Sequence, residues 1–491
     1  MYLPKIKAVT ALICLFSLIA STAGCSINSA TGNSDFIVLS KALEDQIGKD
    51  EHPKIIKQFG GVYKKQDISA YVAVIGGKLA AVTERPDITF TFTVLDSQIV
   101  NAFTTPGGYI YITRGLVALA NTEAQLASVI GHELGHAIAR HNAQRLSQAT
   151  LTQFGLSILG QVAGAPVLND IVGRLAGLYL KAFSREQEFE ADMLGVHYLA
   201  RAGYDPLAAS EFLTKLRDHS QLQAKLAGGK PETIEKFDIT ATHPRTAKRM
   251  ERAIAAANAV PVSDAIVGRT KYLAAIDGMI YGVSTDEGFI DGERFSHRNL
   301  RFEFIVPVGF VLTNRPAQVI ARSKRQNAVI IFDQAPDEFI GNMTTYLDQN
   351  WITDIEVDDL ETIFIHGMEA STGWIRQNAN GKTTIARFVA IRFTPQIIYR
   401  FVLLMPSPSP SRLIAALKRT TYSFRRLTEE EAIALSEKRV RVVHVEIGDT
   451  IETLAKRMVY RDFQRERFEV LNGLSNGRKI FVGESVKIIS H

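Results

Sequence analysis

The order of apolar and polar residues predicts a mainly helical first half of the chain with a short sheet inside it. Apolar residues alternate with threonines from Ile88 to Val94, which is the period-two pattern of a strand. A second strand-like run, from Tyr109 to Ile112, follows the turn-forming residues Pro106, Gly107 and Gly108. Helical periodicity takes over after this run.

Two of the predicted helices have clear start signals. Thr122 is followed three residues later by Gln125, and Ser184 by Gln187. Each pair can form a capping box, in which side chains and backbone amides bond reciprocally at the start of a helix. We therefore predict one helix from about residue 122 and another from about residue 184.

Strand-like runs dominate the region after residue 270. Several runs rich in β-branched and aromatic residues lie between residues 300 and 405, with turn residues between them, and contain no catalytic cluster. The end of the chain differs again, because two short helical segments lie between two strand-like runs. We therefore predict an α+β domain followed by a small βααβ module.

Length and composition complete this picture. A chain of 491 residues with 46% hydrophobic and 22% charged residues should fold into two to four domains. The predicted fold class is multidomain α+β: a mainly helical domain with a short β-sheet at residues 25–262, an α+β domain at 263–430, and the βααβ module at 438–491. The net charge of +5, from 56 basic and 51 acidic residues, is spread along the chain and gives nucleic-acid binding little support.

Residues 1–24 have the order of a secretory signal, with lysines before an uncharged apolar run at residues 8–20. The small residues before Cys25 resemble the cleavage box of a bacterial lipoprotein. The resemblance implies a lipid anchor at Cys25 and a periplasmic place on the outer membrane of a Gram-negative bacterium. An uncleaved membrane anchor is the alternative. The other cysteine, Cys14, lies within the signal, so the mature chain should hold no disulfide.

The first of the two predicted helices carries the pattern His-Glu-Leu-Gly-His at residues 132–136. Residues four apart share a helix face, so both imidazoles can reach one metal ion, and Glu133 can hold a metal-bound water without being a ligand. A catalytic zinc needs a third protein ligand. Asn142 stands where metzincins carry their third histidine, so that ligand must lie elsewhere.

The second predicted helix offers this ligand. Glu188 and Asp192 are four residues apart and share a face. With His132 and His136 they make the arrangement of a gluzincin. We expect Glu188 to bind the metal and Asp192 to accept the ring N–H of a ligand histidine.

Two nearby residues are left out of the predicted site. His141 is one position out of register for a metzincin ligand, so we expect it at the surface or behind the ligands. Glu190 should point to another side of its helix than Glu188, because residues two apart do not share a face.

Several motifs occur in the order of one known family. They are Asn101-Ala102-Phe103, Pro106-Gly107-Gly108, residues 132–141, Ser184-Arg185, Glu188 to Asp192, Ala202 to Pro206, and Thr242-His243-Pro244 with Arg249. They resemble the zinc metallopeptidase family of CAAX prenyl endopeptidase, HtpX and BepA. The resemblance covers residues 46–257. It implies one zinc ion per chain, but transmembrane helices and tetratricopeptide repeats of these members are not recognised here, so substrates and partners do not carry over.

The resemblance also places His243 near the metal. A neutral histidine there would stabilise the oxyanion of the reaction or occupy the open coordination position as a latch. A purely structural histidine is the remaining alternative.

Residues 440–490 resemble a LysM domain over nearly the whole length of such a domain. This implies contact with peptidoglycan or chitin sugars, with a module used only for protein contact as the alternative. Within the middle domain, the segment from His297 to Phe310 resembles PsbP-like domains.

These observations predict a zinc-dependent metalloendopeptidase of the bacterial cell envelope. It would hydrolyse unfolded or misassembled envelope polypeptides through a zinc-activated water with Glu133 as general base. We expect Gly107, Gly108 and Tyr109 to bind substrate at an exposed strand edge, and the uncharged stretch 147–169 to form an amphipathic lid, with a membrane-spanning or membrane-dipping element as the alternative. The alternative is a non-proteolytic or latched zinc-containing chaperone or assembly factor tethered to the cell wall.

Overall fold

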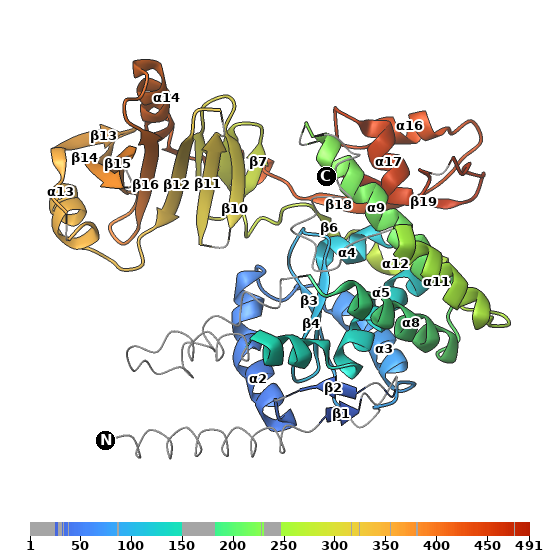
Figure 1. The fold of residues 1–491 in the computed structure, drawn as a ribbon. Helices are drawn as coiled ribbons and strands as arrows, with labels where there is room; N and C mark the ends of the chain where they lie inside the picture. Colours follow the sequence, from blue (N-terminus) through green and yellow to red (C-terminus); the bar gives the residue numbers. More distant parts are fainter. Residues whose placement is uncertain are drawn as a thin grey trace, which may run out of the picture. The chain divides into compact units, whose positions relative to one another are not determined.

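The computed structural model describes residues 25–27, 32, 34–37, 39–85, 88–149, 182–226, 228–229 and 247–491, apart from 316, 324, 354, 380–381 and 476. The signal segment 1–24, His243 and residues 150–169 of the expected lid lie outside the described residues. The chain divides into two compact units (Figure 1). Unit 1 comprises Met1–Tyr281 and Lys438–His491, and unit 2 comprises Gly282–Glu437.

Unit 1 contains a small sheet with the strand order β3-β5-β4 among the described residues. Its strands are β3 (Thr91–Leu95), β4 (Ala102–Thr105) and β5 (Tyr109–Thr113). β5 is parallel to β3 and antiparallel to β4. The expectation that the strand after the Pro-Gly-Gly turn offers a free edge is wrong, because β5 is paired on both sides, and β3 and β4 are the edge strands of this sheet among the described residues. Before the sheet come β1 (Cys25–Ile27), β2 (Ser34–Phe36), α2 (Lys41–Gln58) and α3 (Gln66–Ala80).

Two helices, α5 (Glu123–Ile138) and α8 (Arg185–Arg201), pack against each other in unit 1 (Figure 1). They begin where the sequence predicts. Thr122 accepts a hydrogen bond from the backbone N–H of Gln125 at 3.0 Å. At α8 the capping box of Ser184 and Gln187 is complete.

The close approach of α5 and α8 depends on a glycine. A Cβ atom added at Gly195 of α8 would lie only 2.9 Å from the backbone nitrogen of His132 on α5. A larger residue would therefore force the two backbones apart. Helices α9 (Ala208–Leu226), α11 (Ala247–Ala259) and α12 (Arg269–Ile276) pack against this pair, and α4 (Arg114–Leu119) contacts β5.

The C-terminal module also belongs to unit 1 and has the order strand, helix, helix, strand. Its elements are β18 (Lys438–His444), α16 (Ile451–Lys456), α17 (Gln464–Asn472) and β19 (Ser485–Ser490). β18 pairs with β19 and with β6 (Ile280–Tyr281). Apolar residues of the module, such as Val440 and Val486, pack in the same core as Leu116 and Ala124. The module is thus part of the same packed body as α4 and α5.

Unit 2 is an α+β unit, and the strand-like runs of the sequence form strands there. Seven of its described strands make an antiparallel sheet in the order β10-β11-β12-β16-β15-β14-β13, and four more make a sheet in the order β17-β9-β8-β7. The bounds are β7 (Phe289–Asp291), β8 (Arg294–His297), β9 (Phe302–Ile305), β10 (Val311–Arg315), β11 (Gln318–Ser323), β12 (Ala328–Gln334), β13 (Asp358–Ile365), β14 (Met368–Ala379), β15 (Lys382–Arg392), β16 (Ile398–Pro406) and β17 (Arg425–Arg426), with helices α13 (Met343–Thr345), η2 (Tyr346–Trp351), α14 (Ser411–Tyr422) and α15 (Glu429–Ala434). Aromatic side chains such as Phe302, Phe332 and Phe401 fill its core.

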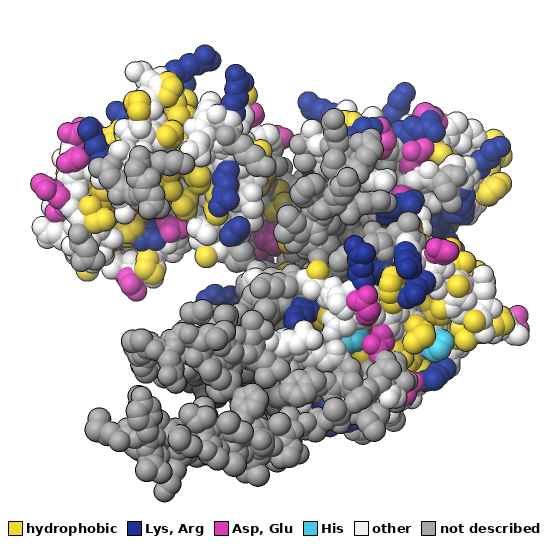
Figure 2. Space-filling view, viewed as in Figure 1, with side chains coloured by type: hydrophobic (Ala, Val, Ile, Leu, Met, Phe, Trp, Pro, Cys, Tyr) yellow, Lys and Arg dark blue, Asp and Glu magenta, His cyan; other side chains and the backbone are white. Residues whose placement is uncertain are grey.

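The surface of the described residues carries charges of both signs. On the face drawn in Figure 2, basic and acidic side chains are interspersed over both units. Among the residues that the structure describes, no helix combines the length and the apolar character needed to cross a membrane.

Candidate metal centre

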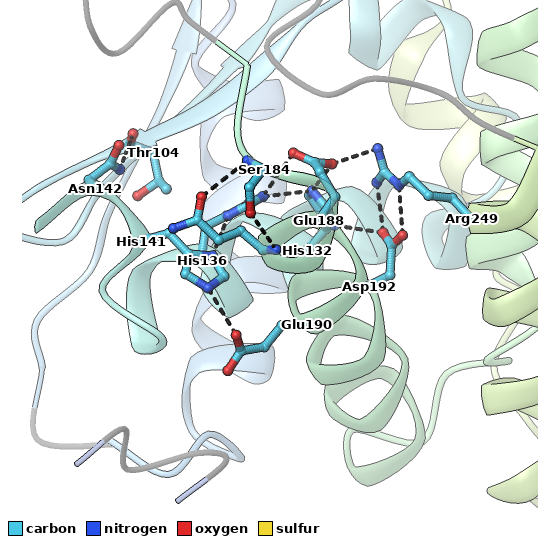
Figure 3. A network of polar contacts seen from close by, with 11 residues as sticks. Thr104, His132, His136, His141, Asn142, Ser184, Glu188, Glu190, Asp192 and Arg249 are labelled. Carbon is cyan, nitrogen blue, oxygen red and sulfur yellow. Dashed lines mark hydrogen bonds and ion pairs between the residues drawn. The ribbon is translucent and has the colours of Figure 1, made fainter. Parts of the chain in front are cut away.

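The histidines of the pattern at residues 132–136 lie on α5 and face Glu188 on α8 (Figure 3). The Nε2 atoms of His132 and His136 are 3.0 Å apart. The two carboxylate oxygens of Glu188 face these nitrogens: Oε2 lies 3.6 Å from Nε2 of His132, and Oε1 lies 3.6 Å from Nε2 of His136. Since the three ligand atoms lie within 4.8 Å of one another, one metal ion can contact all of them.

The cluster is withdrawn from solvent. The side chains of His136 and Glu188 have exposed fractions of 0% and 1%. Burial lowers the pKa of the His136 imidazole well below its usual value, against the opposing effect of Glu188. The imidazole is therefore neutral at neutral pH and has a lone pair for a metal. Two imidazole nitrogens and one carboxylate oxygen are a donor set that suits zinc, and three protein ligands leave a position open.

Glu133 follows His132 on α5 and is also buried. It does not belong to the three residues that can share a metal ion. Its negative charge is one of those that interact with Arg249 of α11. A buried carboxylate beside a metal site, and not part of it, is suited to accept a proton from a water molecule bound there.

A chain of charged contacts supports His132 and Glu188 from one side. The Nδ1 atom of His132 lies 2.8 Å from Oδ1 of Asp192. Arg249 donates to both oxygens of Asp192 at 2.7 Å and lies 2.6 Å from Oε2 of Glu188 (Figure 3). Burial alone would raise the pKa of Asp192, but the Arg249 guanidinium outweighs it and holds the pKa below its usual value. Asp192 is therefore ionised and can accept the ring N–H of His132.

Arg249 was not predicted as a site residue. The sequence gives it only as part of a motif shared with a family, because it lies 57 residues from Asp192 and on another helix. No local spacing links the two positions.

Of the two places expected for His141, the structure shows the one behind the ligands: its side chain is fully buried, and its Nδ1 atom lies 2.7 Å from Nδ1 of His136. Glu190 does point away from the metal ligands, but it is part of the same network, because its carboxylate lies 3.2 Å from Nε2 of His141 (Figure 3). α5 ends in a turn at which Arg140 adopts a positive φ of 56°, and the helical residues 141–149 follow. This turn places His141 against His136.

The Pro-Gly-Gly turn lies beside the candidate metal site. A cavity of about 140 Å³ is lined by Gly107 and Gly108 of the turn, by the start of α2 and by the end of α5, including His136. Tyr109 is not among the lining residues and stacks on His52, with ring centroids 4.6 Å apart. The neighbouring edge strand β4 is held to the site by Asn142, whose side-chain amide donates to the backbone carbonyl of Thr104 at 2.8 Å (Figure 3).

His243 lies outside the described residues. Cys25 is the first residue of β1.

Known proteins share part of this chain. Over 180 residues the chain is 36% identical to "Mitochondrial metalloendopeptidase OMA1" of Arabidopsis thaliana. This alignment covers 36% of this chain and 34% of that protein. Over 236 residues it is 30% identical to "Beta-barrel assembly-enhancing protease" of Escherichia coli, which covers 46% of each. The chain thus spans less than half the length of these relatives.

Solved structures resemble the chain only slightly. The solution structure of a cyanobacterial PsbP protein from Synechocystis covers 30% of this chain and 98% of its own length, with 15% identity and a TM-score of 0.23. A TM-score this low does not indicate a shared fold.

The match to a protein family is more specific. Residues 67–257 match peptidase family M48, and this range contains α5, α8 and Arg249 with all three candidate metal ligands. The chain therefore contains a peptidase domain of family M48.

Proposed function

We propose that the protein is a zinc-dependent endopeptidase of the bacterial cell envelope. The observation that carries the proposal is the buried cluster of His132, His136 and Glu188, whose ligand atoms are close enough to share one ion. The donor set and the open fourth position suit a catalytic zinc ion better than a structural one, which would be enclosed by four protein ligands. The similarity to proteins named as metalloendopeptidase and protease supports the same reading.

The reaction would use few protein groups. Zinc held by His132, His136 and Glu188 would act as a Lewis acid and lower the pKa of a water molecule to about 7. Glu133 would accept a proton from the attacking water and pass it to the leaving amine. His243 would have one of two functional roles: it would stabilise the oxyanion of the reaction, or it would occupy the open coordination position as a latch.

The substrate would be an extended polypeptide. The edge strand β4 has only one partner strand among the described residues, and the cavity at Gly107 and Gly108 lies beside it. A peptide can add to such an edge through backbone hydrogen bonds, which favours unfolded segments over folded proteins. Unfolded or misassembled envelope polypeptides fit this requirement, and the Escherichia coli relative is named as a protease that enhances β-barrel assembly.

The function is tested by cleavage of unfolded casein with the parent protein, Glu133→Gln and Glu186→Gln, each at a measured zinc content. Glu186 is exposed on α8 and serves as the matched control. We expect equal zinc in all three proteins, cleavage by the parent and the control, and a loss of about 100-fold or more in Glu133→Gln, since general acid–base catalysis contributes that much. Zinc without cleavage in the parent would instead favour the latched or non-proteolytic assembly factor.

We propose further that the protein is exported and held at the outer membrane by a lipid on Cys25. The signal pattern of residues 1–24 and the small residues before Cys25 support this. In fractionated cells, Cys25→Ala should move the protein from the membrane to the soluble periplasmic fraction. An unchanged membrane fraction would exclude Cys25 as the anchor.

Finally, we propose that the LysM-like C-terminal module contacts peptidoglycan. The loop after β18 exposes Ile447 with an exposed fraction of 92%, and the loop before β19 exposes Phe481 and Val482 at 64% and 66%. Backbone hydrogen bonds of 2.9 Å and 2.8 Å between residues 445 and 483–484 hold the two loops together. Exposed apolar side chains on adjacent loops can stack on sugar rings.

Sedimentation with insoluble peptidoglycan tests this contact. We expect the parent to cosediment and Ile447→Ser with Phe481→Ser to stay in solution. Ile340→Ser is the control, because Ile340 is an exposed apolar residue of unit 2. Equal sedimentation of all proteins would contradict the proposal.

A further inference from the structure

The two candidate ligand histidines are supported in different ways. His132 contacts a carboxylate directly, at 2.8 Å from Asp192. His136 has another imidazole at the corresponding position: its Nδ1 atom lies 2.7 Å from Nδ1 of His141. The next group in this series of contacts is the carboxylate of Glu190, which lies 3.2 Å from Nε2 of His141.

The order of these contacts determines where the protons are. If His136 binds a metal through Nε2, its Nδ1 atom carries a hydrogen and must donate it. Nδ1 of His141 must then be the acceptor, so the remaining hydrogen of a neutral His141 lies on Nε2. That N–H faces the Glu190 carboxylate, which is a good acceptor for it. A protonated His141 would place two N–H donors against each other.

We propose that Glu190 and His141 form a positioning pair that orients His136 for metal binding. Glu190 selects the His141 tautomer, and that tautomer presents a lone pair to the ring of His136. The inference rests on the proposed zinc site and adds two residues to it that touch neither metal nor substrate. Both residues act through His136.

The surroundings fix this pair in place. The turn at Arg140 places His141 against His136, and Phe183 stacks on a face of the His136 ring, with centroids 3.9 Å apart and an angle of 19° between the planes. The ring of His136 therefore has a fixed plane, and the contact with His141 fixes its direction within that plane. Glu190 lies on α8, two residues from the ligand Glu188.

The test measures zinc affinity by competition with a chelator, which needs no cleavage. His141→Leu removes the acceptor for His136, and we expect its zinc dissociation constant to rise about 10- to 100-fold, as is typical when a hydrogen-bond partner of a ligand histidine is lost. His141→Asn keeps an acceptor at the place of Nδ1 and should recover most of the affinity. Unchanged affinity in His141→Leu, or equal losses in both variants, would overturn the proposal.

Glu190→Ala gives a second measure that leaves His141 in place, and Glu186→Gln is its exposed control on the same helix. We expect Glu190→Ala to weaken zinc binding in the parent and to have no further effect in His141→Leu, because the two residues act as one chain. Additive losses would contradict the pair. Zinc binding by the parent is measured first, because its absence would refute the zinc site itself. If the parent binds zinc and neither substitution changes the affinity, only the positioning pair is refuted.

Discussion

Arg249 places a single positive charge between the buried carboxylate of Glu188 and that of Asp192, whose side chain is 10% exposed. Without this cation, both carboxylates would have less compensation for their negative charge when no metal is bound. We therefore expect Arg249→Met to lower the free energy of unfolding of the zinc-free protein by about 3–5 kcal/mol, as for other broken buried ion pairs. Urea unfolding in the presence of a chelator measures this.

The matched control for this variant is Arg252→Met, because Arg252 is exposed on the same helix. Its free energy of unfolding should stay within about 0.5 kcal/mol of the parent value, as for most surface substitutions. A variant without Arg249 that is as stable as the control would show that the two carboxylates do not depend on the guanidinium.

The residues of the site differ in how far the sequence reveals them. His132, Glu133 and His136 are found by their spacing on one helix, and Glu188 is found because a zinc ion needs a third ligand. The contacts of His141 with His136 and Glu190 are not, since they depend on a turn at Arg140, a residue type for which a positive φ is uncommon. Contacts of this kind are set by the tertiary structure and not by local spacing.

At the scale of elements, the distance between α5 and α8 determines whether the ligands meet. Gly195→Ala would place a Cβ 2.9 Å from the backbone nitrogen of His132, so the helices must shift apart. We expect a loss of about 1–3 kcal/mol in the free energy of unfolding, as for other overpacked cores, together with weaker zinc binding. Thermal or urea unfolding and chelator competition measure the two effects.

Gly77→Ala is the control for helix propensity, because a Cβ at Gly77 of α3 would have no atom within 4 Å. It should stabilise the protein by about 0.5–1 kcal/mol, since alanine is the better helix former. If both alanine variants were stabilised alike, close packing at Gly195 would not control the site.

Elements are predictable where their signals are local. The helix starts at Thr122 and Ser184 follow from capping residues within one turn, and the structure shows both. The central position of β5 does not follow from its own residues, because strand pairing brings together segments that are distant in the sequence. The apolar run of β5 is compatible with an edge or with the middle of a sheet.

At the scale of the whole molecule, one lysine ties the C-terminal module to the peptidase domain. Lys487 of β19 is fully buried, and its Nζ atom donates to the backbone carbonyls of Ala118, Leu119 and Ala120 at 2.6, 3.0 and 2.8 Å. These carbonyls lie at the end of α4, shortly before the helix with the metal ligands begins. The module therefore helps to fix the segment that leads into α5.

We expect Lys487→Met to lower the free energy of unfolding by about 1–3 kcal/mol for each carbonyl that is left without a donor. Lys479→Met is the control, because Lys479 is exposed in the same module. Urea unfolding compares the two variants. Equal stability of both would mean that the contact of Lys487 with α4 contributes nothing.

Unit 2 is inserted between two paired strands of unit 1. Tyr281 of β6 and Lys438 of β18 are direct partners in an antiparallel ladder. A two-residue Asn-Gly turn can join such partners as a hairpin. We expect a chain with residues 282–437 replaced by this turn to fold, to bind zinc and to cleave casein. Loss of zinc binding in a chain that still folds would show that unit 2 contributes to the site.

X-ray absorption at the zinc edge of the parent protein tests the central claim most directly. We predict a first coordination sphere with two imidazole nitrogens and a carboxylate oxygen, at about 2.0–2.1 Å and 2.0–2.2 Å, and the loss of one imidazole in His136→Ala. A sulfur ligand, or a sphere without imidazole, would contradict the assignment of His132, His136 and Glu188 as the zinc ligands.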